Sequence, residues 1–212
     1  MQTEKACVHL KGSNCLVLDV KCFNLERPNM CGFRYHYNYL KPSEQDPLAT
    51  KKIKQLIFEK VINRWKEYGM APSVGKKQMT ARPLEDGIAE FLKQLEDYGV
   101  QVSVRKRFKI IEDVSTVIDC ILTKKEYPTT LISIKTWLGP DFFRESFGNA
   151  YFIKTNYGMR NIKFYIVTLF PLKDHISKEW MELAKPFVDG VYSLSELPYI
   201  DDLLKELEII YK

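Results

Sequence analysis

Two apolar runs of this 212-residue chain each contain one charged residue. Asp119 lies inside the run 117–122, VIDCIL, and Lys135 ends the run 131–135, LISIK. Continuous apolar runs of this length are typical of buried strands. A buried carboxylate or ammonium group is unfavourable unless it is paired, binds a cation or lines a cleft. These two residues are therefore the first candidates for chemistry.

Side chains alternate between the two faces of a strand. If the two runs pair side by side, Asp119, Ser133 and Lys135 share one face of the sheet. The other face is then expected to hold the apolar side chains of Ile118, Cys120, Ile132 and Ile134. The simplest interpretation is one buried salt bridge between Asp119 and Lys135. The order of the surrounding elements indicates whether the pair does more.

Hydrophobic periodicity predicts the elements ahead of this pair. Apolar residues at helical spacing indicate a first helix that begins near Thr50 and ends at Gly69. A second helix is expected to start near Pro83, which is a favourable first-turn residue, and to end at Gly99. The stretch 70–80 between these helices has the composition of a loop.

Strands and helices alternate in the rest of the chain. Alternation over 100–105 predicts a strand directly ahead of the two apolar runs, and three strands so close together favour an antiparallel meander. Later strands at 163–170 and 190–194 are separated by helices, which favours parallel addition to the same sheet. The helices are expected over 141–154, 177–187 and 199–211. The predicted fold class is α/β, a mixed central sheet flanked by helices, with an N-terminal elaboration.

Composition bounds the partners and the location. The net charge of +5, from 32 basic and 27 acidic residues, permits a nucleic-acid partner without demanding one. No apolar run approaches the roughly 20 residues of a membrane span, and the first residues lack the pattern of a signal peptide. We therefore expect a cytoplasmic protein with no membrane partner.

The first 48 residues read as strand and loop, since three prolines interrupt them. Four of the five cysteines and two of the three histidines lie there, but no Cys-x-x-Cys pair occurs. Structural zinc usually wants that close spacing, so free buried thiols are the preferred interpretation over a zinc site. The residues concerned are Cys7, Cys15, Cys22, Cys31, His9 and His36.

The order of elements resembles that of the PD-(D/E)xK nuclease superfamily over roughly residues 81–200. The helix start 82–92, RPLEDGIAEFL, resembles the family's first helix, with Glu85 where its glutamate usually lies. The segment 117–119, VID, resembles the strand that ends on the metal-binding acid. The segment 132–135, ISIK, resembles the second half of the motif. The resemblance implies a restriction-endonuclease-like sheet, with residues 81–212 as the nuclease core.

One position departs from the family's pattern. The usual acid two residues before the lysine is Ser133 here, and serine cannot carry the charge that helps to hold magnesium. Restriction enzymes that read sites with a CCGG core have Ser or Cys there and take the carboxylate from a downstream helix. The similar stretch after Lys135 makes Glu145 the candidate replacement, and Asp141 the alternative, although Asp141 also suits a helix cap.

The resemblance implies magnesium-dependent hydrolysis of a phosphodiester. Asp119 and Glu145 would ligate Mg²⁺ through carboxylate oxygens, and the main-chain carbonyl of Ile134 would add a ligand. Lys135 would contact the scissile phosphate and orient or help to deprotonate the attacking water. Glu85 would act behind the metal ligands or ligate a second ion. A glutamate in a first helical turn can also simply complement the helix dipole.

Among members of this superfamily, the chain looks most like a type II restriction endonuclease. Double-stranded DNA would be its substrate, and a palindromic site would call for a homodimer. Residues 1–80 would then supply dimer contacts or base recognition. Basic groups available to contact phosphates include the pairs or runs at 76–77, 105–107 and 124–125, each of which is also typical of a solvated surface.

Three alternatives remain at this stage. A DNA repair or junction nuclease of the same fold would prefer branched or damaged DNA. A catalytically inactive DNA-binding module is favoured by Ser133 and would bind DNA without cutting it. A metabolic enzyme with an accidental Asp–Lys pair would have no affinity for DNA at low salt.

Overall fold

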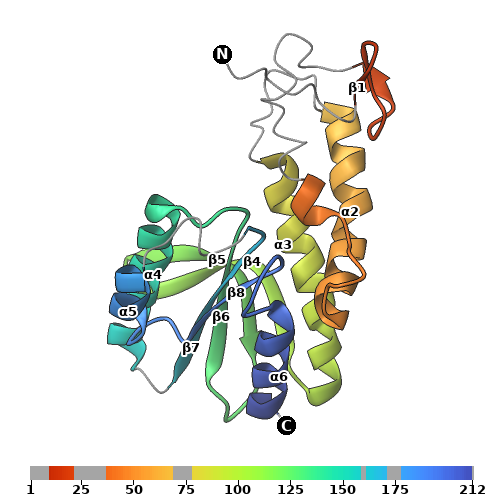
Figure 1. Ribbon diagram of the computed structural model, residues 1–212. Coiled ribbons are helices and arrows are strands. Elements are labelled where there is room, and N and C mark those ends of the chain that lie inside the picture. Colours follow the sequence, from red (N-terminus) through yellow and green to blue (C-terminus); the bar gives the residue numbers. More distant parts are fainter. Residues whose placement is uncertain (1–9, 22–36, 69–77, 159–160, 171–177, 212) are drawn as a thin grey trace.

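The computed structural model describes residues 10–21, 37–68, 78–158, 161–170 and 178–211. Its centre is a five-stranded sheet with the order β4-β5-β6-β7-β8 (Figure 1). The pairs β4–β5 and β5–β6 are antiparallel, and the pairs β6–β7 and β7–β8 are parallel. The strands are β4 (Gln101–Ile111), β5 (Val114–Thr123), β6 (Thr129–Lys135), β7 (Ile162–Thr168) and β8 (Gly190–Ser193). The predicted mixed sheet, with a meander followed by parallel strands, is confirmed.

Helices cover both faces of this sheet. Figure 1 shows α4 and α5 on one side, and α2, α3 and α6 on the other. A 3₁₀ turn, η2 (Lys93–Tyr98), follows α3 and ends at Gly99, whose φ of 77° suits glycine. The helices are α2 (Leu48–Tyr68), α3 (Gln78–Leu92), α4 (Pro140–Tyr157), α5 (Lys178–Ala184) and α6 (Ile200–Tyr211). Each expected helix is present. Among the described residues, no helix combines the length and apolar composition needed to span a membrane.

Two apolar cores form because the sheet is covered on both faces. The core under α2, α3 and α6 contains the buried stripes of these helices together with Cys120, Ile132 and Ile134 of the sheet. The core under α4 and α5 contains alternate residues of the same strands, such as Ile121 and Leu131. Period-2 alternation therefore sorts the two apolar runs between the cores.

The helix α3 begins earlier than expected. It starts at Gln78, so Pro83 lies inside it, not at its first turn. The Trp65 indole of α2 donates a hydrogen bond to Thr80 Oγ1 (3.4 Å) and holds the additional turn in place. Close packing continues at Gly87, where an added Cβ would lie 1.7 Å from the Ile57 side chain. Contact with α2 therefore extends the helix past the position that local sequence favours.

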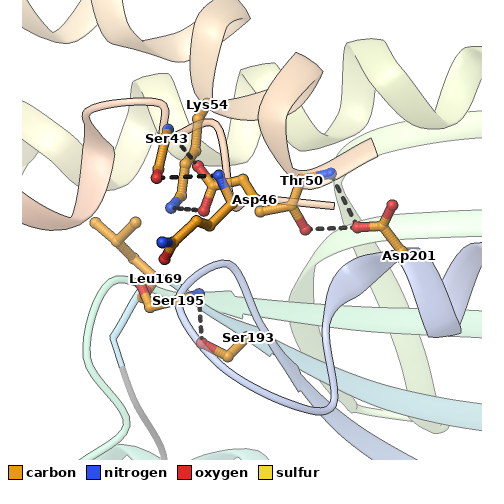
Figure 2. A network of polar contacts seen from close by, with 9 residues as sticks. Ser43, Asp46, Thr50, Lys54, Leu169, Ser193, Ser195 and Asp201 are labelled. Carbon is orange, nitrogen blue, oxygen red and sulfur yellow. Dashed lines mark hydrogen bonds and ion pairs between the residues drawn. The ribbon is translucent and has the colours of Figure 1, made fainter. Parts of the chain in front are cut away.

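The start of α2 is tied to α6 by polar contacts (Figure 2). The Asp201 carboxylate accepts hydrogen bonds from the amides of Ala49 (2.7 Å) and Thr50 (3.0 Å) and from the Thr50 hydroxyl (2.6 Å). It thereby satisfies amides that have no partner within the helix, in the manner of an N-terminal cap. Nearby, buried Lys54 pairs with Asp46 at 2.9 Å. Asp201 thus holds the start of α2 against α6.

The N-terminal segment contains a small sheet of three two-residue strands, β1 (Leu10–Lys11), β2 (Asn14–Cys15) and β3 (Val20–Lys21). Residues 37–40 are helical and not strand or loop as expected. Cys15 is a free, half-buried thiol. The other residues of the conceivable zinc site, Cys7, Cys22, Cys31, His9 and His36, lie outside the described residues. The recognition or dimerisation role of residues 1–80 stays a prediction.

The pairing of β5 changes at Asp119. The ladder between β5 and β6 has three pairs and stops at Cys120↔Ile132. The strands therefore diverge where Asp119 and Ser133 would pair next. On its other edge, β5 pairs with β4 on both sides of this point but not at the position of Arg105 opposite Asp119. Arg105 has a φ of 46°, which is unusual inside a strand.

This irregularity changes which side chains face α4. Ile118 lies in the same core as Ile121, under α4, whereas strict alternation predicted that it would lie beside Cys120. That prediction is wrong: the alternation between the two cores changes at Asp119, where the ladder pair with Arg105 is missing although the register on either side is the same. The polar residue Asp119 sits at the turning point.

Candidate active site

Where the backbone pairing of β5 and β6 stops, the Asp119 carboxylate of β5 accepts a hydrogen bond from the backbone of β6. The Ile134 amide donates a hydrogen bond to Asp119 Oδ2 (2.7 Å), and the Ser133 hydroxyl lies 3.4 Å from the same oxygen. Ser133 also lies 3.3 Å from the Ser146 hydroxyl of α4. Within the described residues, the hydrogen-bond donors to Asp119 are therefore neutral groups. Burial raises the pKa of Asp119, and the Ile134 amide and the Lys135 charge oppose that shift.

Lys135 lies at the end of β6 and reaches toward α4. Its Nζ lies 3.4 Å from Glu145 Oε1 and 5.9 Å from the centre of the Phe142 ring. The Lys135 side chain is 19% exposed and that of Glu145 is 56% exposed, so solvent reaches the pair. Asp141 instead pairs with Arg144 at 3.4 Å on the first turn of the same helix, and its side chain is 94% exposed.

Glu85 reaches this region from α3, which covers the face of the sheet opposite to α4. It pairs with Arg105 Nη1 at 3.2 Å, and Asp86 pairs with Arg105 Nη2 at 2.8 Å. Burial and then the negative charge of Asp119 raise the pKa of Glu85, while Arg105 opposes the shift. The electrostatic effect of Asp119 on Glu85 means that α3 and β5 bring two carboxylates into one region.

These side chains form what we call the Asp119 site. It comprises Glu85, Asp86, Arg105, Asp119, Lys135 and Glu145. Four carboxylates and two cations leave it with a formal charge of −2. Burial raises the pKa values of Glu85 and Asp119, because each ionised carboxylate loses part of its solvation. A divalent cation would neutralise the negative charge of the site.

The donor types suit a hard metal ion. Within the parts of the chain that the structure describes, no three His, Cys, Asp or Glu side chains are grouped so that together they could hold a metal ion. Mg²⁺ usually keeps several waters and takes only one or two protein carboxylates. Asp119 with Glu85 or Glu145 therefore fits magnesium by its chemistry, and Glu145 would have to leave Lys135 to join.

Sequence reasoning missed three members of this region. Arg105 was grouped with basic residues that could contact phosphates, but in the structure it pairs with Glu85 and Asp86. Ser146 supports Ser133 from α4. The antiparallel meander was a usable signal for Arg105, because the register of β4 and β5 places it opposite Asp119. The sequence offered no comparable signal for Asp86 or Ser146.

The surroundings of Lys135 include an aromatic pair. The Trp137 ring lies 5.9 Å from that of Phe142, centre to centre, and Trp137 is 40% exposed. A Cβ on Gly139 would lie 2.5 Å from the Trp137 ring. The absence of a side chain at Gly139 thus allows the indole to lie over the backbone between Lys135 and α4.

Comparison with known proteins finds a fold but no sequence family. No family model matches this chain, and no curated protein matches it. A solved structure described as "Restriction endonuclease PspGI-substrate DNA complex" aligns with 96% of this chain and 87% of its own, with a TM-score of 0.52 and 14% identity. A protein of unknown function, AF1548, aligns with 57% of this chain and 65% of its own, with a TM-score of 0.40 and 15% identity. The first likeness shows that this chain has a restriction-endonuclease-like fold.

Proposed function

We propose that this chain is a magnesium-dependent endonuclease of the PD-(D/E)xK superfamily that hydrolyses phosphodiester bonds of double-stranded DNA. The observation that carries the proposal is the grouping of charged side chains where the pairing of β5 and β6 stops. They are Asp119, Lys135, Glu85 and Glu145. It occurs on a fold shared with a restriction endonuclease that was solved with its substrate DNA. A type II restriction enzyme is the specific form that we propose.

Bound magnesium would offset the charge of the phosphate and hold a water for attack. Asp119 and Glu145 would hold the ion through carboxylate oxygens, with the main-chain carbonyl of Ile134 as a further ligand. Glu85 would support them or ligate a second ion. The Ile134 amide already fixes one oxygen of Asp119, which orients the carboxylate before any ligand arrives.

Lys135 would contact the scissile phosphate. Its ammonium group is partly exposed, lies at the end of a rigid strand and has the charge to stabilise an anionic transition state. On release from Glu145 it could also orient the attacking water or help to remove its proton. The contact between Lys135 and Glu145 is loose at 3.4 Å, so exchange of partners when substrate binds is inexpensive.

Ser133 would act by positioning and not by charge. Its hydroxyl lies between Asp119 and Ser146, which links the carboxylate of β5 to α4. The missing acid is then supplied from α4. The contact of Glu145 with Lys135 supports Glu145 for this role, while Asp141 is engaged with Arg144.

Double-stranded DNA is the proposed partner, and a homodimer inside the cell is the proposed assembly. A restriction enzyme that reads a palindrome needs two active sites related by a two-fold axis. Residues 1–80 are the proposed source of dimer contacts or base recognition. Fastening of α2 to α6 through Asp201 would transmit their position to the core.

The test is incubation of the purified protein with plasmid and phage DNA, with and without magnesium. We expect discrete bands only with magnesium, and none from Asp119→Asn, while binding of DNA persists. Asp113→Asn is the matched control, because Asp113 is an exposed acid in the turn between β4 and β5. Full activity of Asp119→Asn would remove the assignment of the site.

An inactive DNA-binding module is the second candidate. It is favoured by Ser133 at the usual acid position and by the pairing of Glu145 with Lys135. It predicts DNA binding that magnesium does not affect, with no product at any protein concentration. A repair or junction nuclease of the same fold would instead cut branched or damaged substrates in preference to intact duplex.

A further inference from the structure

Arg105 has an unusual backbone conformation for a residue inside a strand. Three non-glycine residues in the described parts of the chain have positive φ: Asp19, Arg105 and Glu126. Asp19 and Glu126 lie in turns, whereas Arg105 lies within β4. Such a conformation is unfavourable for a side chain with a Cβ and persists only where surrounding contacts hold it.

The contacts that hold Arg105 are two ion pairs with α3. The guanidinium uses one nitrogen for Glu85 (3.2 Å) and the other for Asp86 (2.8 Å). A planar guanidinium can serve two carboxylates in this way, which an ammonium group does less well. The Glu85 side chain is 15% exposed, so its negative charge depends on Arg105 more than that of a surface residue would.

Arg105 also lies opposite Asp119 in the register of β4 and β5, at the position where the ladder is interrupted. The charge of Asp119 acts on Glu85, and Arg105 opposes it. Arg105 therefore occupies the position of a counterion between α3 and β5. A divalent cation bound by Asp119 and Glu85 would supply the same positive charge to the same carboxylates.

We propose that Arg105 is an internal counterion that competes with the divalent cation for Glu85 and so lowers the affinity of the Asp119 site for metal. This inference rests on the proposed function. When a metal is bound, Glu85 would exchange Arg105 for the ion, and Asp86 would retain the guanidinium nearby. Arg105 is thus a positioning residue, which holds Glu85 and reduces the negative charge of the site before metal arrives.

A purely structural role makes a different prediction. If Arg105 only fastened α3 to β4, its removal would lower stability and leave or reduce the affinity for metal. If it competes with metal, its removal would raise that affinity, because Glu85 and Asp119 would face each other without a cation. Affinity for metal, measured without DNA, therefore separates the two roles.

The experiment is a titration of the protein with magnesium, in which calorimetry measures the affinity. Thermal unfolding at several magnesium concentrations is the second readout. We expect Arg105→Gln to bind Mg²⁺ roughly two- to fivefold more tightly than the natural sequence, the effect of removing one partly exposed ion-pair partner. Arg107→Gln, an exposed arginine two residues further along β4, is the matched control and should bind Mg²⁺ unchanged. Equal or weaker binding by Arg105→Gln would overturn the inference.

Two further variants keep the test decisive. Arg105→Lys retains a charge but not the two-pronged contact, so we expect an affinity between those of the natural sequence and Arg105→Gln, even if the latter folds poorly. Adding Arg105→Gln to Glu85→Gln should change the affinity by less than twofold, because the shared carboxylate charge is already gone. If neither the natural sequence nor any of the variants bound Mg²⁺, both the proposed function and this inference would fail. If the natural sequence bound Mg²⁺ and its affinity did not change with the residue at position 105, only this inference would be overturned.

Discussion

The helix α4 meets the sheet through charged groups near both of its ends, and the two ends differ. Toward its C-terminus, Lys154 is 3% exposed and pairs with Asp189 at 2.5 Å. Asp189 also accepts hydrogen bonds from Lys163 (3.1 Å) and from the Phe164 amide (2.7 Å). Toward its N-terminus, Glu145 is half exposed and lies 3.4 Å from Lys135. Lys154, Lys163 and Asp189 are called the Asp189 cluster below.

The difference separates charges that are buried and fully paired from charges that solvent reaches. In the Asp189 cluster, both carboxylate oxygens have donors and the central pair is shielded from solvent. In the Asp119 site, the ion pair of Lys135 and Glu145 is longer, at 3.4 Å, and solvent reaches it, and the formal charge of the site is −2. A site with unbalanced charge and replaceable partners can accept a cation and a phosphate, whereas a filled one cannot.

The largest expected effect is on the Asp189 cluster. Asp189→Ala would leave the Lys154 ammonium buried without a partner, so the free energy of unfolding should fall by about 3–5 kcal/mol. The rate of DNA cleavage per folded molecule should not change. Urea denaturation measures the first and plasmid cleavage the second. Adding Lys154→Met should recover most of the loss, and a loss below about 1 kcal/mol would contradict the contrast drawn here.

The opposite pattern is expected for Lys135 in the Asp119 site. Lys135→Met should lower the rate of cleavage on the order of 10²–10³-fold, because one preorganised positive charge at the phosphate is removed. The free energy of unfolding should change by less than about 1 kcal/mol, since the pair with Glu145 is solvent-accessible. Single-turnover cleavage and urea denaturation measure these values. Lys205→Met, at an exposed position of α6, is the control. Strong destabilisation by Lys135→Met would mean that the two clusters are alike.

A smaller effect should decide between the two acids of α4. Glu145→Gln is expected to reduce cleavage roughly 10- to 100-fold at limiting magnesium, and an increase in magnesium should restore part of the rate. Asp141→Asn should change the rate by less than about twofold, because Asp141 is exposed and engaged with Arg144. The dependence of cleavage on magnesium concentration is the measurement. The reverse ranking of the two variants would place the missing acid at Asp141.

The smallest effect concerns Cys120, next to Asp119 but on the opposite face of β5. Burial, and then the charge of Asp119, raise the pKa of Cys120 from 9.0 to about 12. The unfolded chain ionises this thiol near pH 9.0 while the folded protein keeps it protonated. The contribution of Cys120 to the free energy of unfolding is therefore complete below about pH 9 and is lost as the pH rises toward 12.

Alkylation measures this difference directly. At pH 9, Cys120 in the folded protein should react on the order of 10²–10³-fold more slowly than in urea, since the thiolate is the reactive form. Peptide mass spectrometry distinguishes it from half-buried Cys15. Rapid alkylation of Cys120 in the folded state would show that the polar site extends through the sheet to the apolar face.

Local sequence predicted most elements of the fold because burial patterns are local. The strand around residues 163–170 is present as β7, and the stripe expected over 199–211 is buried in α6. The two places where periodicity failed both involve contacts between elements. Packing on α2 extends α3 past Pro83, and Ile118 lies under α4, next to the point where the pairing of β4 and β5 is interrupted.

The sequence by itself determined that Ser133 and Lys135 share one face of their strand, because side chains alternate along it, and it predicted Asp119 beside them if the two apolar runs pair. Only the tertiary structure decided that Arg105 pairs with Glu85, that Ser146 supports Ser133 and that Lys135 contacts Glu145. The physical reason is range. Periodicity records which side of an element is buried, but a contact between α3, β4 and α4 depends on where packing places three separate elements relative to one sheet.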